Sequence, residues 1–293
     1  MPDYVISCCS TCDLNLEHYV KRNIKVACFH FEIDGKEYLD DGEFPINDFY
    51  SAMAKGAMPK TSQINVDEYI RHFEPFLEAG KDILHLTLSS GISGTINSAN
   101  IAANELRERY PGRKLYIIDS LAASSGYGLL VDTVCDLRDE GMSIDDLKKW
   151  VKGHRLELNH WFFTSDLTHF VRGGRISKTA GFVGGALKIC PLLNVDFEGK
   201  LVPREKYRGI DNVIHATALK MQENAKGGAG YNGKCYISHS ACMENAEKLI
   251  KEVEVLIPAM KGKIRVYDVG TTIGSHTGPG TVALFFWGNN RED

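Results

Sequence analysis

Short apolar segments alternate with longer amphipathic segments along most of this chain. The short segments are bounded by turn residues and are typical of strands buried in a sheet. They predict β strands at residues 4–7, 26–33, 82–88, 115–119, 161–165, 235–238, 264–269 and 282–287. The longer segments carry apolar residues three and four positions apart, with Gly or Pro close behind the last turn, and predict helices. These helices are expected at residues 66–80, 98–110, 127–141 and 243–257. Strands that alternate with helices indicate an α/β fold.

Two turn sequences indicate that part of the sheet structure is antiparallel. Asp34-Gly35 lies between two strand-like runs as a two-residue hairpin turn does, and Glu198-Gly199 has the same character. The sheets are therefore expected to be mixed. After the glycine-rich segment 172–188 the pattern changes to a hairpin and further α/β units. We therefore expect two α/β domains, at residues 1–157 and 158–293.

Composition and charge narrow the functional classes. The 293-residue chain is 43% hydrophobic and 25% charged, which is ordinary for a globular protein. Its net charge is -4, and Lys and Arg are spread along the sequence, so nucleic acid is not an expected partner. The apolar run 282–287 is far below the roughly 18 residues of a membrane span, so no stable membrane insertion is expected. The N-terminus lacks the pattern of a secretory signal, and we expect a cytoplasmic protein with reduced cysteines.

Three of the eight cysteines lie within five residues, in "SCCSTCDL" at 7–14. Cys9 and Cys12 match C-x-x-C at a predicted junction of strand and helix, where a helix N-terminus would lower a thiol pKa. A redox pair is one interpretation. A structural zinc usually takes four ligands, and the chain has no second C-x-x-C and no H-x-x-x-H, so no metal is expected. Small buried thiols are the interpretation that the pattern favours.

The octapeptide "LSSGISGT" at 88–95 ends an apolar strand and begins a long predicted helix. Ligands bind at the carboxyl ends of strands in α/β sheets, and the free N–H groups of a helix suit an anion. Ser93 and Thr95 add hydroxyls there, although such residues also cap helices with no further function. The segment is not the G-x-S-x-G elbow of hydrolases, because residue 95 is Thr.

Three other segments combine glycines or hydroxyls with residues that bind anions. They are "PKTSQIN" at 59–65, which is expected to form a loop between two helices, "RGGRI" at 172–176, and "GSHTGPGT" at 274–281. Arginines beside glycines are natural partners of a carboxylate or phosphate. Each segment, taken singly, is also typical of a solvated turn. No P-loop sequence and no G-x-G-x-x-G after a strand occurs, so no nucleotide cofactor is expected.

Taken in order, "TSQ" at 61–63, "SSGISGT" at 89–95, "IIDS" at 117–120, "GGRIS" at 173–177 and "HTGPG" at 276–280 resemble the DegV family of bacterial fatty-acid-binding proteins, the FakB class. The resemblance runs from about residue 3 to 288. It implies two α/β domains with a ligand cleft and an apolar tunnel between them, which enclose one long-chain fatty acid. It further implies a carrier without catalytic residues or cofactor, which presents the acid to a separate ATP-dependent kinase subunit that makes acyl phosphate for phospholipid synthesis.

Residues are assigned by the resemblance as follows. Thr61, and Ser93 with the neighbouring Gly94, match the positions that bind the carboxylate, and Arg172 and His276 match positions that complete the polar network. In two places the chain departs from the family. Cys9 stands where the opening motif usually has an acid, and Cys190 where a basic residue is common.

Two alternatives stay open from the residues alone. A hydrolase would use Ser93 as nucleophile with His276 as base, although no acidic third member is evident. A redox protein would use Cys9 and Cys12. In the carrier interpretation, Cys9 is expected to make a loop near the ligand less acidic.

Overall fold

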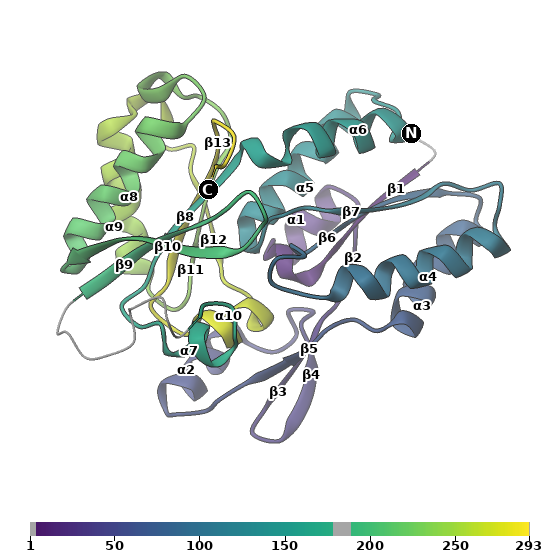
Figure 1. The fold of residues 1–293 in the computed structure, drawn as a ribbon, viewed down its shortest axis with the longest axis horizontal. Helices are drawn as coiled ribbons and strands as arrows, with labels where there is room; N and C mark the ends of the chain where they lie inside the picture. The colour runs from purple at the N-terminus through teal and green to yellow at the C-terminus, as the bar shows by residue number, and fades with distance from the viewer. Residues whose placement is uncertain (1–3, 178–188, 293) are drawn as a thin grey trace.

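A computed structural model describes residues 4–177 and 189–292. The chain forms a mixed α/β fold with three sheets (Figure 1), as the alternating pattern predicts. The first sheet has the order β2-β1-β6-β7 and is parallel throughout. Its strands are β1 (Tyr4–Cys9), β2 (Ile24–Ala27), β6 (Asp82–Thr87) and β7 (Leu115–Asp119). The apolar runs of β6 and β7 explain why these two strands were predicted close to their observed limits.

Helices cover both faces of the first sheet. On one side lie α3 (Val66–Glu78) and α4 (Thr95–Arg109), and on the other α5 (Ser124–Asp139) and α6 (Ile144–His154) (Figure 1). A short helix, α1 (Leu16–Lys21), follows β1 and packs on β2. Asn65 begins α3 with a capping box, in which its side chain accepts from the Glu68 amide and the Glu68 carboxylate accepts from the Asn65 amide.

The second sheet is mixed, with the order β10-β9-β8-β13-β11-β12, and β8 is its first strand in the sequence. Only the β11–β12 pair is parallel. The strands are β8 (Leu158–Phe163), β9 (Ile189–Val195), β10 (Leu201–Arg208), β11 (Cys235–His239), β12 (Arg265–Asp268) and β13 (Val282–Trp287). The helices α8 (Ile210–Asn224) and α9 (Met243–Leu256) pack together on one face. The second sheet starts at Leu158, next to the predicted domain boundary after residue 157. The boundary itself stays a prediction.

Both predicted hairpins are confirmed. Asp34 and Gly35, at φ 51° and 74°, connect β3 (His30–Ile33) to β4 (Lys36–Leu39). Gly199, at φ 76°, lies in the turn between β9 and β10. At Asp34-Gly35, positive φ at both central residues gives the two-residue turn whose twist matches antiparallel strands, whereas five residues, 196–200, connect β9 to β10.

Two expectations for the first half are wrong, and so is the interpretation of residues 274–281 as a turn alone. Residues 26–33 form two strands in different sheets, because the chain turns at Phe29, whose amide donates to Ser10 Oγ. The expected loop at 59–65 contains a strand, β5 (Lys60–Ser62), which completes a third sheet of order β4-β3-β5. It follows α2 (Ile46–Ala54). Glycine-rich 274–281 is partly helical, because α10 spans Thr271–Thr277.

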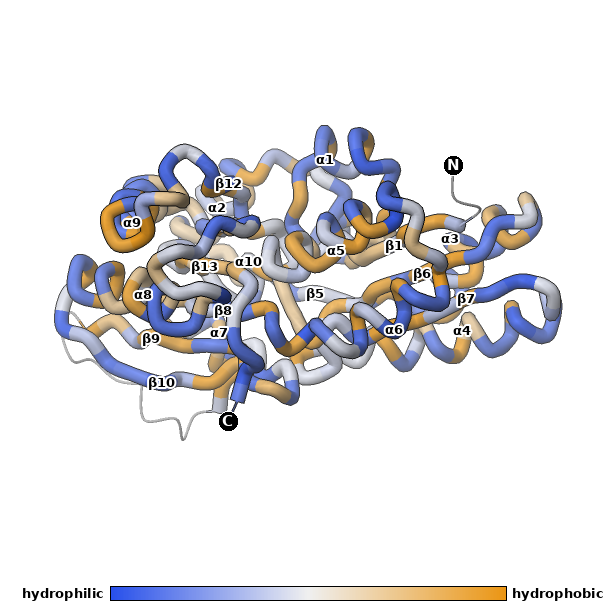
Figure 2. Tube along the Cα trace, turned by 90° about the horizontal axis from the view of Figure 1, so that it is seen from above, coloured by the Kyte–Doolittle hydropathy of each residue, from blue (hydrophilic) through white to orange (hydrophobic). Residues whose placement is uncertain are grey.

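The helix α5 lies between the two large sheets and contacts strands of both. Twelve of its sixteen residues are buried, which explains why its apolar pattern is broad instead of one-sided. Glycines allow the close approach: a Cβ at Gly126 would clash with Phe285, and one at Gly128 would clash with Leu14. The largest buried cluster accordingly runs from Ile6 in β1 to residues of β13 without interruption. In Figure 2 hydrophobic segments follow the central strands β1 and β6, and hydrophilic ones follow outer loops.

A buried carboxylate fixes α5 to its surroundings. Asp132 accepts a hydrogen bond from Tyr236 in β11 at 2.8 Å and lies 2.9 Å from His18 Nε2 in α1. Lys234 forms an ion pair with the same carboxylate. These donors hold the pKa of Asp132 well below its usual range despite its burial. Asp132 thus joins three elements from both halves of the chain.

Candidate functional site

A narrow cavity of about 90 Å³ lies between the first and second sheets. Its walls come from the loops after β6 and β7, from β8, β9, β10 and β13, and from α10. Most lining side chains are apolar: Phe29, Leu88, Ile92, Phe162, Phe170, Val195, Leu201, Val269, Ile273, Ala283 and Phe285. The cavity therefore offers a ligand an apolar environment at the carboxyl ends of the first sheet, where α/β proteins bind their ligands.

Polar side chains also line this cavity. Thr61, Ser93, Arg175 and His276 all contribute to its wall. Thr61 Oγ1 lies 2.7 Å from His276 Nε2, and His276 Nδ1 lies 3.3 Å from an Arg175 guanidinium nitrogen. The structure thus brings three predicted residues, Thr61, Ser93 and His276, to one cavity and adds Arg175.

Thr61 is positioned by the small third sheet. It lies in β5 opposite Phe31 of β3, and Phe31 is 1% exposed within a cluster of aromatic side chains. Pairing with β3 fixes the position of β5, and His276 forms a hydrogen bond with the Thr61 hydroxyl. A three-residue strand in a hydroxyl-rich loop gives almost no periodicity, which is why the sequence does not reveal it.

Ser93 and Gly94 lie in the loop that precedes α4. Ser93 Oγ accepts a hydrogen bond from the Thr95 amide at 3.3 Å, and Thr95 Oγ1 lies 2.8 Å from Tyr69 OH. Gly94 is the N-cap residue of α4 and is exposed, so it contributes backbone and no side chain. Ser93 therefore combines the predicted capping role with a place on the cavity wall.

The protonation of His276 follows from its neighbours. Burial lowers its pKa to about 4, and the positive charges of Arg175 and Arg172 lower it further in the same direction. The imidazole is therefore neutral at pH 7. Since the Arg175 guanidinium only donates, Nδ1 accepts and the ring proton lies on Nε2, which donates to Thr61 Oγ1. The hydroxyl proton of Thr61 then remains available to an acceptor in the cavity.

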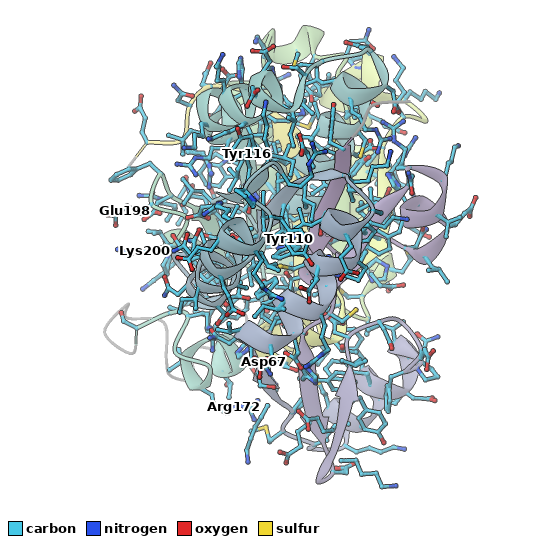
Figure 3. The ribbon with its side chains drawn as sticks, turned by 90° about the vertical axis from the view of Figure 1, so that its right-hand side faces the viewer. Asp67, Tyr110, Tyr116, Arg172, Glu198 and Lys200 are labelled. Carbon is cyan, nitrogen blue, oxygen red and sulfur yellow. The ribbon has the colours of Figure 1, made fainter. Side chains whose placement is uncertain are left out.

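The two arginines of "RGGRI" have different places. Arg172 donates to the carbonyl oxygens of Pro59 at 3.0 Å and Ser275 at 3.4 Å, and lies at the edge of the molecule (Figure 3). It connects the loop before β5 to α10, behind the cavity wall. Arg175 lines the cavity, and burial lowers the pKa of its guanidinium. The sequence indicates both arginines of this motif as partners of an anion, but the resemblance assigns only Arg172 to the site, and Arg175 is the one that lines the cavity.

The geometry does not form a hydrolytic triad in the described part of the chain. A triad needs a carboxylate on the far nitrogen of the histidine, and here that nitrogen faces Arg175. Ser93 Oγ accepts a hydrogen bond from the Thr95 amide, and His276 Nε2 bonds to Thr61 and not to Ser93.

The cysteines of "SCCSTCDL" are buried away from this cavity. Cys9 Sγ lies 3.4 Å from Tyr69 OH and 3.7 Å from His85 Nε2, and Cys8 Sγ lies 3.4 Å from Cys12 Sγ. Burial raises the pKa of Cys9 to about 11, so the expectation of a lowered thiol pKa is wrong. Cys9 does not line the cavity, so the presence of Cys9 where the family usually has an acid does not change the cavity wall. Cys190 is likewise buried, in β9.

Within residues 4–177 and 189–292, no three His, Cys, Asp or Glu side chains gather in a way that would hold a metal ion. Over the same residues, every helix is too short or too polar to cross a membrane. The second half of the glycine-rich segment, residues 178–188, lies outside the described residues.

Comparisons with known proteins agree with this architecture. The model of a family described as "Uncharacterised protein, DegV family" matches residues 6–289. A DegV domain-containing protein of Clostridium perfringens is 38% identical over 297 residues, covering 100% of both chains. A fatty acid-binding protein of Thermotoga maritima is 31% identical over 258 residues, covering 86% of this chain and 85% of its own. The fatty acid kinase B3 protein of Streptococcus pneumoniae, solved with linoleic acid, shares the fold, with a TM-score of 0.83, 22% identity, and coverage of 99% and 100%.

Proposed function

This chain belongs to the DegV family. From that premise we propose that it binds one long-chain fatty acid at the cavity between its two large sheets, whose walls move apart to admit the chain, because about 90 Å³ is less than the roughly 300 Å³ at which ligand pockets begin. The observation that carries the proposal is the combination of an apolar wall with Thr61, Ser93, Arg175 and His276. A fatty acid has the matching chemistry, a long apolar chain that ends in one carboxylate. The name of the Thermotoga maritima relative supports the same ligand class.

The carboxylate lies among the hydroxyls of Thr61 and Ser93. Thr61 keeps a free hydroxyl proton because His276 already donates to its oxygen. Arg175 supplies positive charge close by, which offsets the cost of taking a carboxylate out of water. Arg172 acts through Pro59 and Ser275, whose carbonyls it holds, and positions the wall without touching the ligand.

The tail provides most of the affinity. A chain of ~16 carbons buries ~14 methylenes, worth roughly 11 kcal/mol before ordering and association costs. Two hydrogen bonds to a carboxylate contribute about 1.5–3 kcal/mol each. The polar residues therefore mainly fix where the carboxylate lies. No bound cofactor is needed for this role, and the described residues supply none of the motifs for one.

The protein then presents the carboxylate to a separate ATP-dependent fatty acid kinase subunit, which forms the acyl phosphate. This step is supported by the name of the Streptococcus pneumoniae protein of the same fold. A carrier suits the chemistry, because the kinase must find one carboxylate oxygen in a defined place while the tail stays out of water. The use of ATP places the proposed function in the cytoplasm.

Extraction of the native ligand tests the first part. Protein produced in bacteria is denatured, extracted with organic solvent, and the extract is analysed by mass spectrometry. We expect near-stoichiometric long-chain fatty acid. Protein without lipid that also fails to bind added fatty acid would refute the proposal. Incubation of the loaded protein with ATP and a bacterial fatty acid kinase subunit then tests the second part, with acyl phosphate as the readout.

A further inference from the structure

A second hollow lies outside the cavity described above. It is a half-open groove of about 780 Å³ between α1, the loop after β4, and the segment from β12 to the start of α10. This volume is within the range of pockets that hold small organic molecules. Its described lining shares no residue with the cavity of the proposed fatty acid.

The groove is acidic. Its lining includes the carboxylates of Asp13, Asp40, Asp41, Glu43 and Asp268. Against these stands a single basic side chain in the described lining, that of Lys25. Over the described residues none of the five carboxylates is paired with Lys or Arg. Acidic side chains elsewhere in the protein commonly have such a partner, so this groove carries uncompensated negative charge.

Buried acceptors without partners point to what the groove would bind. Asp40 Oδ1 accepts from Thr271 Oγ1 at 2.6 Å, whereas Asp40 Oδ2 is buried and has no partner. Asp13 Oδ2 accepts a hydrogen bond from the Ser124 hydroxyl at 2.5 Å. Asp13 Oδ1 faces the Gly270 amide but has no hydrogen-bond partner with normal geometry. A Cβ at position 270 would lie 2.6 Å from Asp13 Oδ1 and 3.5 Å from Asp40 Oδ1, so the two carboxylates lie close together on either side of Gly270.

A histidine gives an independent indication. His239 lines the groove, is 6% exposed, and has no partner for Nδ1. Its Nε2 faces Asp268 at 3.6 Å, which favours the proton on Nε2 and leaves Nδ1 as an acceptor. Buried acceptors of this kind are rare without a donor. Burial raises the pKa of Asp13 well above its usual range, so Asp13 contributes less negative charge than the other carboxylates while the groove is empty, and a cation beside it would lower that pKa again.

The rim of the groove is apolar. Leu16 and Val20 are each 71% exposed and lie one helical turn apart on α1, and Met243 at the start of α9 is 46% exposed. All three line the groove. Large apolar side chains so exposed beside a hollow mark a place where an apolar group packs.

We propose that this groove binds a small organic cation, an ammonium or guanidinium group attached to an apolar body. The cation lies between Asp13 and Asp40 and donates to their free oxygens and to His239. The apolar body lies against Leu16, Val20 and Met243. The inference does not depend on the proposed fatty acid. The two sites do share a helix, since Thr271 holds Asp40 and His276 lies at the other end of α10.

Phenethylamine, protonated at pH 7.5, is a suitable probe, with neutral 2-phenylethanol as its matched control. Titration calorimetry uses the full-length protein, and the neutral alcohol reports any binding in the apolar cavity. We expect the amine to bind and the alcohol not to bind. Asp40→Asn should weaken the amine at least about tenfold, because a charged hydrogen bond is lost. Asp67→Asn on α3 (Figure 3), an exposed change of equal charge, should leave it unaltered.

A second variant avoids any doubt about folding. Val20→Lys places a positive charge at an exposed rim position and should also weaken binding of the amine, with an unchanged melting temperature. Agmatine and spermidine extend the test to guanidinium and polyamine ligands. The proposal is overturned if none of the three amines binds at millimolar concentration, if 2-phenylethanol binds equally well, or if Asp40→Asn and Val20→Lys have no effect. Binding only of a basic peptide would also overturn it, in favour of a protein partner.

Discussion

Thr61 Oγ1 and His276 Nε2 are 2.7 Å apart, although 215 positions separate them in the chain. One belongs to a three-residue strand in the first third of the sequence, the other to a helix close to its end. Arg175 approaches the same imidazole from a third segment. The head-group end of the cavity therefore exists only when three distant segments have assembled, and its disturbance should affect the position of a ligand more than the amount bound.

The double variant Thr61→Ala, Ser93→Ala tests this division of roles. It should retain most fatty acid binding, because the apolar tail provides most of the affinity, and lose most phosphorylation by the kinase subunit. Ligand is measured by mass spectrometry and acyl phosphate by a radiolabelled ATP assay. Ser62→Ala, the exposed neighbour of Thr61, is the control. Normal phosphorylation of the double variant would show that the carboxylate is held elsewhere.

Gly173→Ala should displace His276 without straining the backbone. Residue 173 has φ -71° and ψ -8°, which alanine adopts readily, but its Cβ would clash with His276 Nδ1. A shift of the imidazole of about 1 Å is expected to reduce phosphorylation at least about tenfold. Gly112→Ala, where a Cβ meets open space, is the control. The His276 ring resonances in NMR spectra should move in the first variant only, and unmoved resonances would contradict the assignment.

The ligand-free protein should lose stability between pH 6.5 and 4. Burial lowers the pKa of His276 to about 4, whereas the unfolded chain protonates its histidines near 6.5. Between these values the unfolded state binds more protons than the native state. The free energy of unfolding therefore decreases as the pH is lowered from 6.5 to 4, by at most about 3 kcal/mol for this residue. His276→Gln should flatten the dependence measured by urea unfolding, and exposed His215→Gln should not. An identical slope in His276→Gln would indicate that His276 is already protonated in the native state.

Asp132→Asn should destabilise the whole protein. The carboxylate is 3% exposed and is held by His18 of α1, by Lys234 just before β11, and by Tyr236 in β11. Its loss leaves buried donors unsatisfied and should lower the free energy of unfolding by about 3 kcal/mol at pH 7. Since these donors lower the pKa of Asp132, its contribution is present above about pH 4 and lost as the pH falls further. The variant and wild type should therefore converge in acid, with Asp211→Asn as an exposed control.

Thiol titration separates a carrier from a redox protein. The chain has eight cysteines, and those in the described structure are unpaired. Burial raises the pKa of Cys9 to about 11 and that of Cys235 further. We expect slow reaction of the native protein with a thiol reagent and eight thiols after denaturation, with or without a mild oxidant. Loss of two thiols after oxidation would favour a redox role for a pair among Cys8, Cys9 and Cys12.

Cys9→Asp should change stability instead of ligand choice. Position 9 is fully buried beside Tyr69 and His85 and does not line the cavity. A carboxylate at this position would be paired only if His85 became protonated. If it stayed unpaired, its burial would lower the free energy of unfolding by several kcal/mol. The acyl composition of bound lipid should match the wild type. A changed acyl composition would restore the expectation that this loop influences the ligand.

Local signals predicted the elements that they control directly. The hairpin at Asp34-Gly35 was predictable because a two-residue turn needs positive φ at both positions. The parallel strand β7 was predicted with its observed limits, since its apolar run is short and bounded by turn residues. The helices α6 and α8 were not predicted, although α6 carries a local signal: Ile144, Leu147 and Val151 have helical spacing, and Ser143 caps the first turn.

The site was predictable in composition and less so in arrangement. Thr61, Ser93 and His276 reach one cavity, as the resemblance implies, but no local pattern distinguishes Arg172 from Arg175. Which arginine faces inward depends on how α7 (Thr168–Arg172) ends and on its contact with α10, both of which are tertiary effects. The short strand β5 is equally invisible locally, because its pairing with β3 defines it.

The position of α5 between the two sheets also limits how this scaffold can diversify. A surface helix tolerates substitution along its whole outer side, but α5 is exposed only near its C-terminal end, so most changes there must be accommodated by neighbours from both halves. Strand residues such as Val195 and Leu201 and the cavity loops meet fewer such demands. Descendants of this chain that acquire new ligands should therefore differ in strands and loops around an almost invariant central helix.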